Sequence, residues 1–393
     1  MKILQLVPRI PAPAVDGGAI YVYCIAKELA KSGNDVIIAA LESNKHKQDV
    51  KPLKEFSKVY TVKGNFKKYS LTAAIKSLIT RKPITVQHRM RMQVIEKLID
   101  KIEEDVDIIL IEGIHISVAL PLLREKFPAT PIVLRQSNVE HEVLYTVGKH
   151  KNSFLEKLFY KWQGKFMKSF EINRMQKVDA VTVISEYDLN KFKKLLPGVQ
   201  YFISSAGAYM PEIKEKRKEK YLISISNWEW DPNIQGLKWF LDNVWPEIHS
   251  INPDITYAVA GKGIPEKMRK NYTLLNIEFL GFVDNIEKFR QQGTLFIAPL
   301  FSGSGMKLKV LEAFASGLPT ITTKVGIQGI KAEAGKDYIH AETAEEFIEG
   351  IQFLIENKTK RDIIGDNAQS VINHSYRWPV LAQKFEDFLK TLT

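Results

Sequence analysis

The chain has 393 residues, which is too long for one ordinary hydrophobic core and predicts two domains. Its 45% hydrophobic and 26% charged residues are typical of a soluble globular protein and exclude a disordered or fibrous chain. The 56 basic and 45 acidic residues leave a net charge of +11, which favours an anionic partner such as a phosphorylated small molecule, an anionic membrane or a nucleic acid. A generally lysine-rich proteome would produce the same charge without such a partner.

The single cysteine and the lengths of the apolar runs narrow the class of protein. Cys24 alone excludes an intramolecular disulfide and a cysteine-based zinc site, and its apolar helical surroundings are typical of a core residue. The N-terminal apolar run is broken at Pro8 and Arg9, too early for a secretory signal. No apolar run approaches the roughly 18 residues that span a bilayer. We therefore expect a cytoplasmic protein, with peripheral attachment to the cytoplasmic face of a membrane left open.

Strand-like and helix-like segments alternate through the first half of the chain. A helix is predicted over 19–31, and buried strands are predicted over 2–7, 35–41, 107–111, 131–134 and 179–184. Gly17 and Gly18 fall in the loop between the first strand and the first helix, where glycine lets a ligand approach the backbone. The G-x-G-x-x-G pattern of dinucleotide binding is absent, and a glycine pair is more often only a turn.

Residues 149–177 combine basic and aromatic side chains at helical spacing. Lys157, Lys161 and Lys165 form one row, and a second row recurs every four residues at Phe154, Leu158, Trp162, Phe166 and Phe170. A basic amphipathic helix with an aromatic face can lie on an anionic membrane. The commoner alternative is a core helix with a solvated basic face.

The second half begins with a charge run and then repeats the alternation. Residues 214–220, KEKRKEK, have no apolar face and predict an interdomain linker. A helix is predicted over 232–244, and strands over 221–226, 255–260, 276–280 and 295–300. The last residues predict helices over 343–356, with a Thr343–Glu346 capping box, and over 360–374 and 379–392. The alternation predicts an α/β protein of two Rossmann-like, doubly wound domains, with ligands at the carboxyl ends of the strands in the cleft between them.

The segment FSGSGMKLKVLEAFASGLP, residues 301–319, predicts a Gly-rich loop and a short helix with a glycine stop, between strands predicted over 295–300 and 320–325. Ser304, Gly305 and Met306 precede the helix, and backbone N–H groups near Leu308 and Lys309 could hold a diphosphate. Lys307 and Lys309 would supply charge, and Glu312, on the same helix face as Leu308, could accept hydrogen bonds from both ribose hydroxyls. The loop is not a Walker loop. A surface role for Glu312 fits poorly, because its neighbours are apolar.

This segment resembles the retaining nucleotide-sugar glycosyltransferases of the family 4, or group 1, type. Collinear segments that resemble the same family are AGKG at 260–263, GFVD at 281–284, DAVTVIS at 179–185 and NWEWDPNIQGLKW at 227–239. Gly17 and Gly18 fall at the family's first-domain glycine loop. The resemblance covers nearly the whole chain and is stronger in the second domain.

The resemblance implies the GT-B architecture of two Rossmann-like domains facing a cleft. It implies an acceptor-binding domain over 1–210, joined by a terminal helix over about 376–393, and a donor-binding domain over 211–375. The implied activity is retaining transfer of a sugar from a UDP- or GDP-linked donor to a glycan or lipid-linked acceptor, in synthesis of cell-surface polysaccharide or glycoconjugate, with no cofactor and no metal. The implied donor-binding residues are Gly17, Gly18, Asn227, Val283, Ser304, Gly305, Met306, Lys307, Leu308, Lys309 and Glu312.

Two departures from the family pattern bear on the chemistry. Ser304 stands where the family has the first glutamate of its E-x7-E pair, which contacts the donor sugar. Ser137 stands where a first-domain histidine is usual. The catalytic candidates that remain nearby are His115, Asn138 and Glu140. A protein base is not obligatory, because the leaving phosphate itself could accept the proton of the acceptor.

Other activities remain open at this point. A non-catalytic nucleotide-sugar-binding scaffold subunit is favoured by Ser304 and Ser137. A different GT-B enzyme, such as a sugar-nucleotide epimerase or a phosphorylase, would share the architecture, although a phosphorylase also needs a lysine bound to pyridoxal phosphate. No nucleic-acid partner is expected, because the basic residues form no recognisable binding motif of that type.

Overall fold

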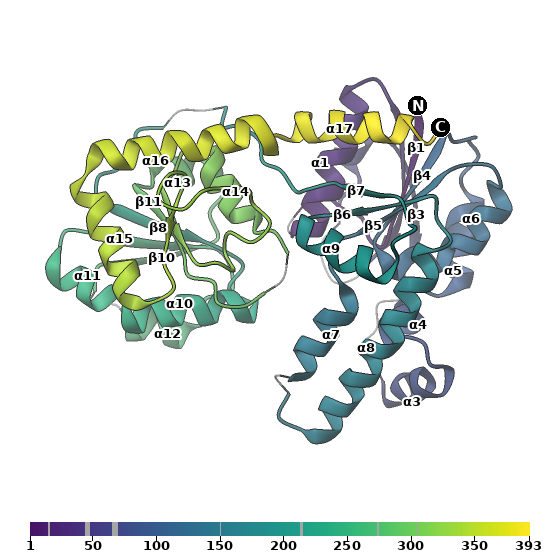
Figure 1. Ribbon diagram of the computed structural model, residues 1–393, viewed down its shortest axis with the longest axis horizontal. Coiled ribbons are helices and arrows are strands. Elements are labelled where there is room, and N and C mark those ends of the chain that lie inside the picture. The colour runs from purple at the N-terminus through teal and green to yellow at the C-terminus, as the bar shows by residue number, and fades with distance from the viewer. Residues whose placement is uncertain are drawn as a thin grey trace. The chain divides into compact units, whose positions relative to one another are not determined.

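Two compact units make up the part of the chain that the computed structural model describes. The described residues are 1–14, 16–43, 48–64, 70–149, 151–212, 215–272, 275–303 and 305–393, without the side chains of 88 and 89. Unit 1 comprises Met1–Ser205 and Leu381–Thr393, and unit 2 comprises Ala206–Val380 (Figure 1).

Unit 1 is built on a sheet of seven parallel strands in the order β3-β2-β1-β4-β5-β6-β7. The strands are β1 (Lys2–Val7), β2 (Asp35–Glu42), β3 (Lys58–Lys63), β4 (Ile108–Glu112), β5 (Ile132–Gln136), β6 (Ala180–Val183) and β7 (Tyr201–Ile203). β1 pairs with β2 on one side and with β4 on the other, so the strand order reverses between β1 and β4. Ligands of doubly wound sheets bind at the carboxyl ends of the strands near such a reversal.

Helices connect these strands and supply the rest of the core of unit 1. They are α1 (Gly17–Lys31), α2 (Lys51–Lys54), α3 (Leu71–Thr80), α4 (Ile84–Arg89), α5 (Met92–Asp100), the 3₁₀ helix η1 (Ile114–Ala119), α6 (Leu120–Lys126), α7 (Glu140–Lys149), α8 (Phe154–Met175) and α9 (Glu186–Leu195). Side chains from α5, η1, α6 and the C-terminal half of α8 pack on the sheet, and Cys24 is buried in α1, as expected.

Unit 2 repeats the same architecture with six parallel strands in the order β10-β9-β8-β11-β12-β13. The strands are β8 (Tyr221–Ile225), β9 (Thr256–Ala260), β10 (Ile277–Gly281), β11 (Leu295–Ala298), β12 (Thr320–Thr322) and β13 (Ile339–His340). The helices are α10 (Asp231–Asn243), α11 (Trp245–Ile251), α12 (Glu266–Asn271), α13 (Ile286–Gln292), α14 (Leu308–Ala315), α15 (Ala344–Glu356), α16 (Lys358–Val371), the π-helical turn η2 (Ile372–Tyr376) and α17 (Trp378–Lys390). The predicted α/β fold class with two Rossmann-like sheets is confirmed.

The cap of α15 and the position of the last helix both bear on predictions made for the second half of the chain. The capping box is confirmed, because Thr343 caps α15 and the Glu346 carboxylate accepts from the Thr343 backbone N–H at 3.1 Å. The last helix, α17, begins in unit 2, and its residues from Leu381 onward belong to unit 1. There Phe388 stacks on Phe202 with ring centroids 4.6 Å apart.

The predicted linker at 214–220 is wrong, because its described residues, 215–220, are fastened to unit 2. The backbone N–H of Lys218 donates to the carbonyl of Gln292 at 2.9 Å, and Arg217 donates to the carbonyl of Ser316 at 3.2 Å. The charged pattern conceals these bonds, since it shows side-chain polarity and not backbone partners.

Candidate functional site

The Gly-rich loop after β11 leads directly into α14, as the sequence predicts. Gly303 has a φ of 111° and Gly305 a φ of 76°, a region of backbone conformation that other residues rarely adopt. Lys307 is the N-cap, and α14 begins at Leu308, so the N–H groups of Leu308 and Lys309 precede the first helical bonds. The bond from the Val310 N–H to the Lys307 carbonyl, at 2.9 Å, closes the first turn. Helix geometry thus aims several backbone donors and the positive end of the helix dipole into the loop.

Lys307 and Lys309 are both held inward over this helix start. Lys309 Nζ donates to Ser226 Oγ at 2.9 Å and to Asn233 Oδ1 at 2.7 Å, and Lys307 Nζ donates to the Gly305 carbonyl at 2.5 Å. Burial lowers the pKa of Lys307 to about 8. Burial, and next the charge of Lys307, lower the pKa of Lys309 to about 7. The start of α14 therefore carries two desolvated lysines whose charged forms an anion would stabilise.

The loop after β8 forms the opposite wall of this site. Asn233, on α10, donates from Nδ2 to the carbonyl of Asn227 at 2.8 Å while its Oδ1 accepts from Lys309. The α10 helix comes close to the end of β11, because a Cβ on Gly236 would lie 1.9 Å from the Pro299 carbonyl oxygen. Asn233 and Gly236 both belong to the PNIQGLKW segment, so its residue pattern has a physical reason. Sequence reasoning missed Ser226 and Asn233 as site residues.

Glu312 lies one turn into α14 and forms an ion pair that the sequence did not reveal. Its Oε2 accepts from Arg290 Nη2 at 2.6 Å. Arg290 is nearly buried, whereas about a third of the Glu312 side chain is exposed. The ion pair fixes the carboxylate while leaving it accessible. Arg290 comes from α13, 22 residues earlier in the chain, and nothing in that spacing marks it as a partner.

The remaining predicted donor residues fall at different places in unit 2. Met306 is partly buried in the loop before α14, and Asn227 is exposed after β8. Val283 is partly exposed after β10, a strand that lies at the edge of the sheet. Ser304 lies outside the described residues. Unit 2 therefore brings together Asn227, Gly305, Lys307 and Lys309 with Asn233, while Val283 follows the edge strand of the sheet.

Gly17 and Gly18 are the first residues of α1 and not part of the loop before it. Asp16 caps this helix, its Oδ1 accepting from the Ala19 N–H at 3.2 Å, and it also pairs with Arg9. Both glycines are exposed, and among the described residues a Cβ on Gly18 would meet Asp16 Oδ1 alone, at 3.6 Å. Packing within unit 1 thus gives no reason for a glycine at position 18, whereas a ligand lying against this helix start would give one.

The three catalytic candidates follow the carboxyl ends of β4 and β5, which pair with each other. His115 lies in η1 and is partly exposed. Asn138 Nδ2 donates to Glu140 Oε1 at 3.3 Å, so these two side chains are brought together. The Glu140 N–H donates to Glu171 Oε1 at 3.0 Å, which fixes the start of α7 on α8. The neighbouring His141 is buried, with Nδ1 2.5 Å from Glu171 Oε2, and burial raises the pKa of Glu171.

A buried charged pair at the same strand ends was not predicted. Glu112 Oε2 accepts from Arg135 Nε at 2.5 Å, and Glu112 Oε1 accepts from Gln5 Nε2 at 3.2 Å. The Arg135 guanidinium lies over the ring of Tyr21, 4.0 Å from its centroid. The pair links β1, α1, β4 and β5, so it fixes the edge of the sheet that presents His115 and Glu140.

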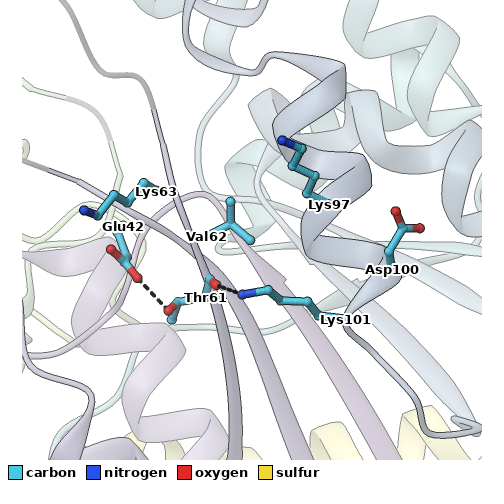
Figure 2. Close-up of a pocket in the computed structure, with 7 residues that line it drawn as sticks. All are labelled: Glu42, Thr61, Val62, Lys63, Lys97, Asp100 and Lys101. Carbon is cyan, nitrogen blue, oxygen red and sulfur yellow. Dashed lines mark hydrogen bonds between the residues drawn. The ribbon is translucent and has the colours of Figure 1, made fainter.

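A cavity of about 500 Å³ opens beside β2, β3 and α5 in unit 1 (Figure 2). It is lined by Glu42, Thr61, Val62, Lys63, Lys97, Asp100 and Lys101. Thr61 Oγ1 donates to Glu42 at 2.7 Å, and Lys101 Nζ donates to the Thr61 carbonyl at 3.0 Å. Glu42 and Lys101 are thus hydrogen-bonded to Thr61 in the cavity wall, and none of the predicted site residues lines this cavity.

The described residues contain neither a metal-binding cluster nor a membrane-spanning helix. Among those residues, no three His, Cys, Asp or Glu side chains gather as a metal site. None of the described helices has the length and apolar character needed to cross a bilayer.

Comparisons with known proteins match both the fold and the second unit. Residues 219–357 match the family model described as Glycosyl transferases group 1. An uncharacterized 44.6 kDa protein in the cps region of Klebsiella pneumoniae is 23% identical over 400 residues, covering 95% of this chain and 96% of the relative.

Solved structures extend the match in fold to the whole chain. Sucrose-phosphate synthase from Thermosynechococcus elongatus has a TM-score of 0.72 at 14% identity and covers 100% of this chain and 99% of its own. Anabaena HepE, solved in complex with UDP, has a TM-score of 0.70 at 16% identity and covers 100% of both chains. Residues 219–357 are thus similar to group 1 glycosyltransferases, and the whole chain shares the two-domain fold of these solved structures.

Proposed function

We propose that this protein transfers a sugar from a nucleoside diphosphate sugar to a glycan or lipid-linked acceptor, with retention of the anomeric configuration. The observation that carries the proposal is the pair of desolvated lysines over the start of α14. Lys309 is held by Ser226 and Asn233, and its pKa is lowered to about 7. A diphosphate would restore the charge of both lysines and accept hydrogen bonds from the Leu308 and Lys309 N–H groups.

The proposed reaction breaks the bond between the anomeric carbon and the diphosphate oxygen. The diphosphate leaves with the electron pair, and the acceptor oxygen forms its bond to the anomeric carbon on the same face. The leaving phosphate oxygen takes the proton of the acceptor hydroxyl, so the step balances without a protein base. Lys307, Lys309 and the helix dipole stabilise the charge that develops on the leaving group, which is the role that a metal has in other transferases.

The nucleoside end of the donor is assigned to α14 and the β10 edge. The Glu312 carboxylate, oriented by Arg290, would accept from the ribose hydroxyls, and backbone groups at Val283 would hold the base. Ser304, Gly305, Met306 and Asn227 would line the path of the sugar and diphosphate. Anabaena HepE has been solved with UDP and with UDP-glucose, which makes UDP-linked sugars the first donors to test.

Within unit 1 we assign Gly17 and Gly18 to the donor, and His115, Asn138 and Glu140 to the acceptor. The exposed glycines at the start of α1 would allow a donor phosphate to approach the backbone. Glu140 and Asn138 share a hydrogen bond at 3.3 Å and would orient an acceptor hydroxyl. Similarity to a protein encoded in a cps region supports a role in synthesis of cell-surface polysaccharide.

A thermal-shift screen against UDP, GDP, ADP and their sugar conjugates tests the donor assignment. A ligand at 100 times its dissociation constant adds about 2.7 kcal/mol to the free energy of unfolding. We expect one nucleotide series to raise the melting temperature, and its sugar conjugate then to label an acceptor pool with the anomeric configuration retained. A protein that no nucleotide stabilises would contradict the proposal. Nucleotide binding without any transfer would identify a binding subunit instead.

The variant Glu140→Gln separates the acceptor side from the donor side. We expect kcat to fall about tenfold, because the amide orients an acceptor hydroxyl less well than the carboxylate. UDP affinity should stay unchanged, since Glu140 is assigned to the acceptor and not to the nucleotide. Isothermal titration with UDP and steady-state kinetics with varied acceptor provide the two readouts. An unchanged kcat would remove Glu140 from the assignment.

A further inference from the structure

The helices α7 and α8 form an antiparallel hairpin that is anchored at one end on the sheet of unit 1. His141 contacts Glu171 near the sheet, and further out the ring of Tyr145 packs on Gly164, where a Cβ would lie 2.3 Å from the ring. Met167 and Met175 of α8 belong to the core, whereas residues 154–162 of the helix contribute no buried side chain. Figure 1 shows both helices extending beyond the sheet, with α3 beside α8.

One face of the outer half of α8 is apolar and exposed. The side chains of Phe154 and Leu155 are 76% and 75% exposed, and that of Trp162 is 45% exposed. At 100° per residue, Phe154, Leu158 and Trp162 fall within one side of the helix, opposite the buried Gln163. An ordinary surface helix buries its apolar side. Here the apolar side faces solvent, and such a surface marks a site of interaction.

Lysines share this face with the apolar side chains. A groove of about 530 Å³ between the two helices is lined by Tyr145, Gly148, Lys149, Lys157, Lys161, Trp162 and Lys165. Among the ion pairs of the described residues, none involves Lys157, Lys161 or Lys165. Residues 149–177 contain eight basic and two acidic residues, and one of the acids, Glu171, is buried against His141. The face is therefore strongly positive as well as apolar.

The neighbouring α3 adds exposed apolar surface to the same end of unit 1. Its Ser77 is buried and accepts from Gln163 Nε2 of α8 at 2.8 Å, so the two helices are joined. Leu71 and Ile79 lie on the other side of α3, and each is 78% exposed. This helix, like α8, directs its apolar side chains away from the protein.

We propose that the outer face of α8 docks on an anionic phospholipid bilayer. Phe154, Leu155, Leu158 and Trp162 enter the interfacial region, and the groove lysines bind lipid phosphates. The positive charge of this face favours a membrane over a second copy of the chain as the partner. A second copy would bring one row of lysines against another without compensating acids, and the two rows would repel each other. Apolar side chains and unpaired lysines on one face match the two components of an anionic bilayer surface. Docking there would hold unit 1 beside lipid-linked molecules.

Vesicle co-sedimentation tests the proposal with the full chain and without any nucleotide, so its outcome does not depend on the transfer reaction. We expect binding to vesicles that contain phosphatidylglycerol, and at least tenfold weaker binding to vesicles of phosphatidylcholine alone. Added salt should weaken the binding steeply, because the lysines are solvated. Brominated acyl chains should quench tryptophan fluorescence in wild type, and Trp162→Phe should remove most of this quenching.

Paired variants assign the binding to this face. Phe154→Ser with Leu155→Ser should reduce vesicle affinity at least tenfold, and Lys157→Gln, Lys161→Gln and Lys165→Gln together by roughly 100-fold, since each lysine near the surface contributes about 1 kcal/mol. The matched controls are Ile251→Ser with Ile363→Ser, and Lys358→Gln, Lys360→Gln and Lys384→Gln, which are exposed elsewhere and should bind as wild type does. All variants should keep the melting temperature of wild type, because the substituted side chains are exposed.

Three results would overturn the proposal. The first is equal binding to neutral and anionic vesicles, or no binding to either. The second is a concentration-dependent dimer that the Phe154 and Leu155 substitutions abolish, which would assign the face to a second copy. The third is binding of soluble glycerol phosphate or an anionic glycan in the groove without vesicle binding. If UDP still stabilises a protein that fails on vesicles, the donor assignment stands while the docking proposal falls.

Discussion

Two basic regions of this molecule have opposite physical character. In unit 2, Lys307 and Lys309 are partly buried at the start of α14, bonded to protein oxygens, with lowered pKa values. In unit 1, Lys157, Lys161 and Lys165 are exposed beside aromatic side chains. Desolvated lysines held in one place can bind a single small anion, whereas exposed lysines can contact an extended anionic surface. The same residue type therefore suits the proposed diphosphate site in one place and the proposed membrane-facing surface in the other.

The largest expected effect comes from removing the more deeply held lysine. Lys309→Ala deletes the cation that Ser226 and Asn233 orient, and nucleotide affinity should fall roughly 100-fold, since a charged hydrogen bond contributes about 1.5–3 kcal/mol. Isothermal titration with the nucleotide found in the screen measures the loss. Lys161→Ala, an exposed lysine of α8, is the matched control and should bind nucleotide normally. Equal losses in both variants would erase the contrast between the two regions.

The pH dependence of nucleotide binding should be the next largest effect. In the free protein the pKa of Lys309 is about 7, and an anion raises it by favouring the charged form. Affinity should therefore be constant below about pH 7 and fall by more than tenfold toward about pH 9, where only about one in a hundred free Lys309 side chains is protonated. Titrations in buffers of different ionisation enthalpy should show proton uptake. A flat profile in wild type would contradict the buried-lysine site, and a flattened profile in Lys309→Ala would support it.

Added salt should weaken vesicle binding by the exposed lysines about ten times more than it weakens nucleotide binding by the partly buried lysines. Raising the ionic strength from about 0.05 M to about 0.5 M screens exposed charges much more than buried ones. Vesicle binding through α8 should weaken more than tenfold, while nucleotide affinity should change only a few-fold. Both are measured on one preparation, by co-sedimentation and by titration. If the nucleotide site showed the steeper salt dependence, its lysines would have to be solvated.

The smallest of these effects is expected at the Glu312–Arg290 ion pair. Glu312→Ala should weaken nucleotide binding about tenfold and also lower the melting temperature, because Arg290, nearly buried, loses its carboxylate partner. Glu312→Gln keeps an oxygen acceptor for both partners and should do less on each measure. Titration and thermal unfolding are compared for both variants. A lowered melting temperature with unchanged affinity would make Glu312 only a structural partner of Arg290.

The Gly-rich loop before α14 was predictable because the residues that form it are consecutive in the chain. Glycines, two lysines and a helix start all fall in 303–315, so local rules alone predict the loop, the helix and its anion-binding end. The capping box at Thr343 was predictable for the same reason. In contrast, Ser226, Asn233 and Arg290 reach this loop from other elements, and no spacing in the chain marks them as partners of Lys309 or Glu312.

Unit 1 was harder to predict because its polar groups come from separate strands. The Glu112–Arg135 pair joins β4 to β5 and could not be read from either strand alone. The strands β3 and β7 were not predicted, since neither contains a buried side chain. Residues 214–220 were misassigned as a linker, because their backbone bonds to α13 leave no trace in a charged sequence.

By itself the sequence determined the alternating α/β pattern, the Gly-rich helix start and its family resemblance, because each depends on residues close together along the chain. The length of the chain indicated two domains. Only the tertiary structure decided which lysines are desolvated and which are solvated. It did so by placing Ser226 and Asn233 against Lys309 and by extending α8 beyond the sheet. Burial is set by contacts between distant segments, and it is burial that distinguishes these two sets of lysines.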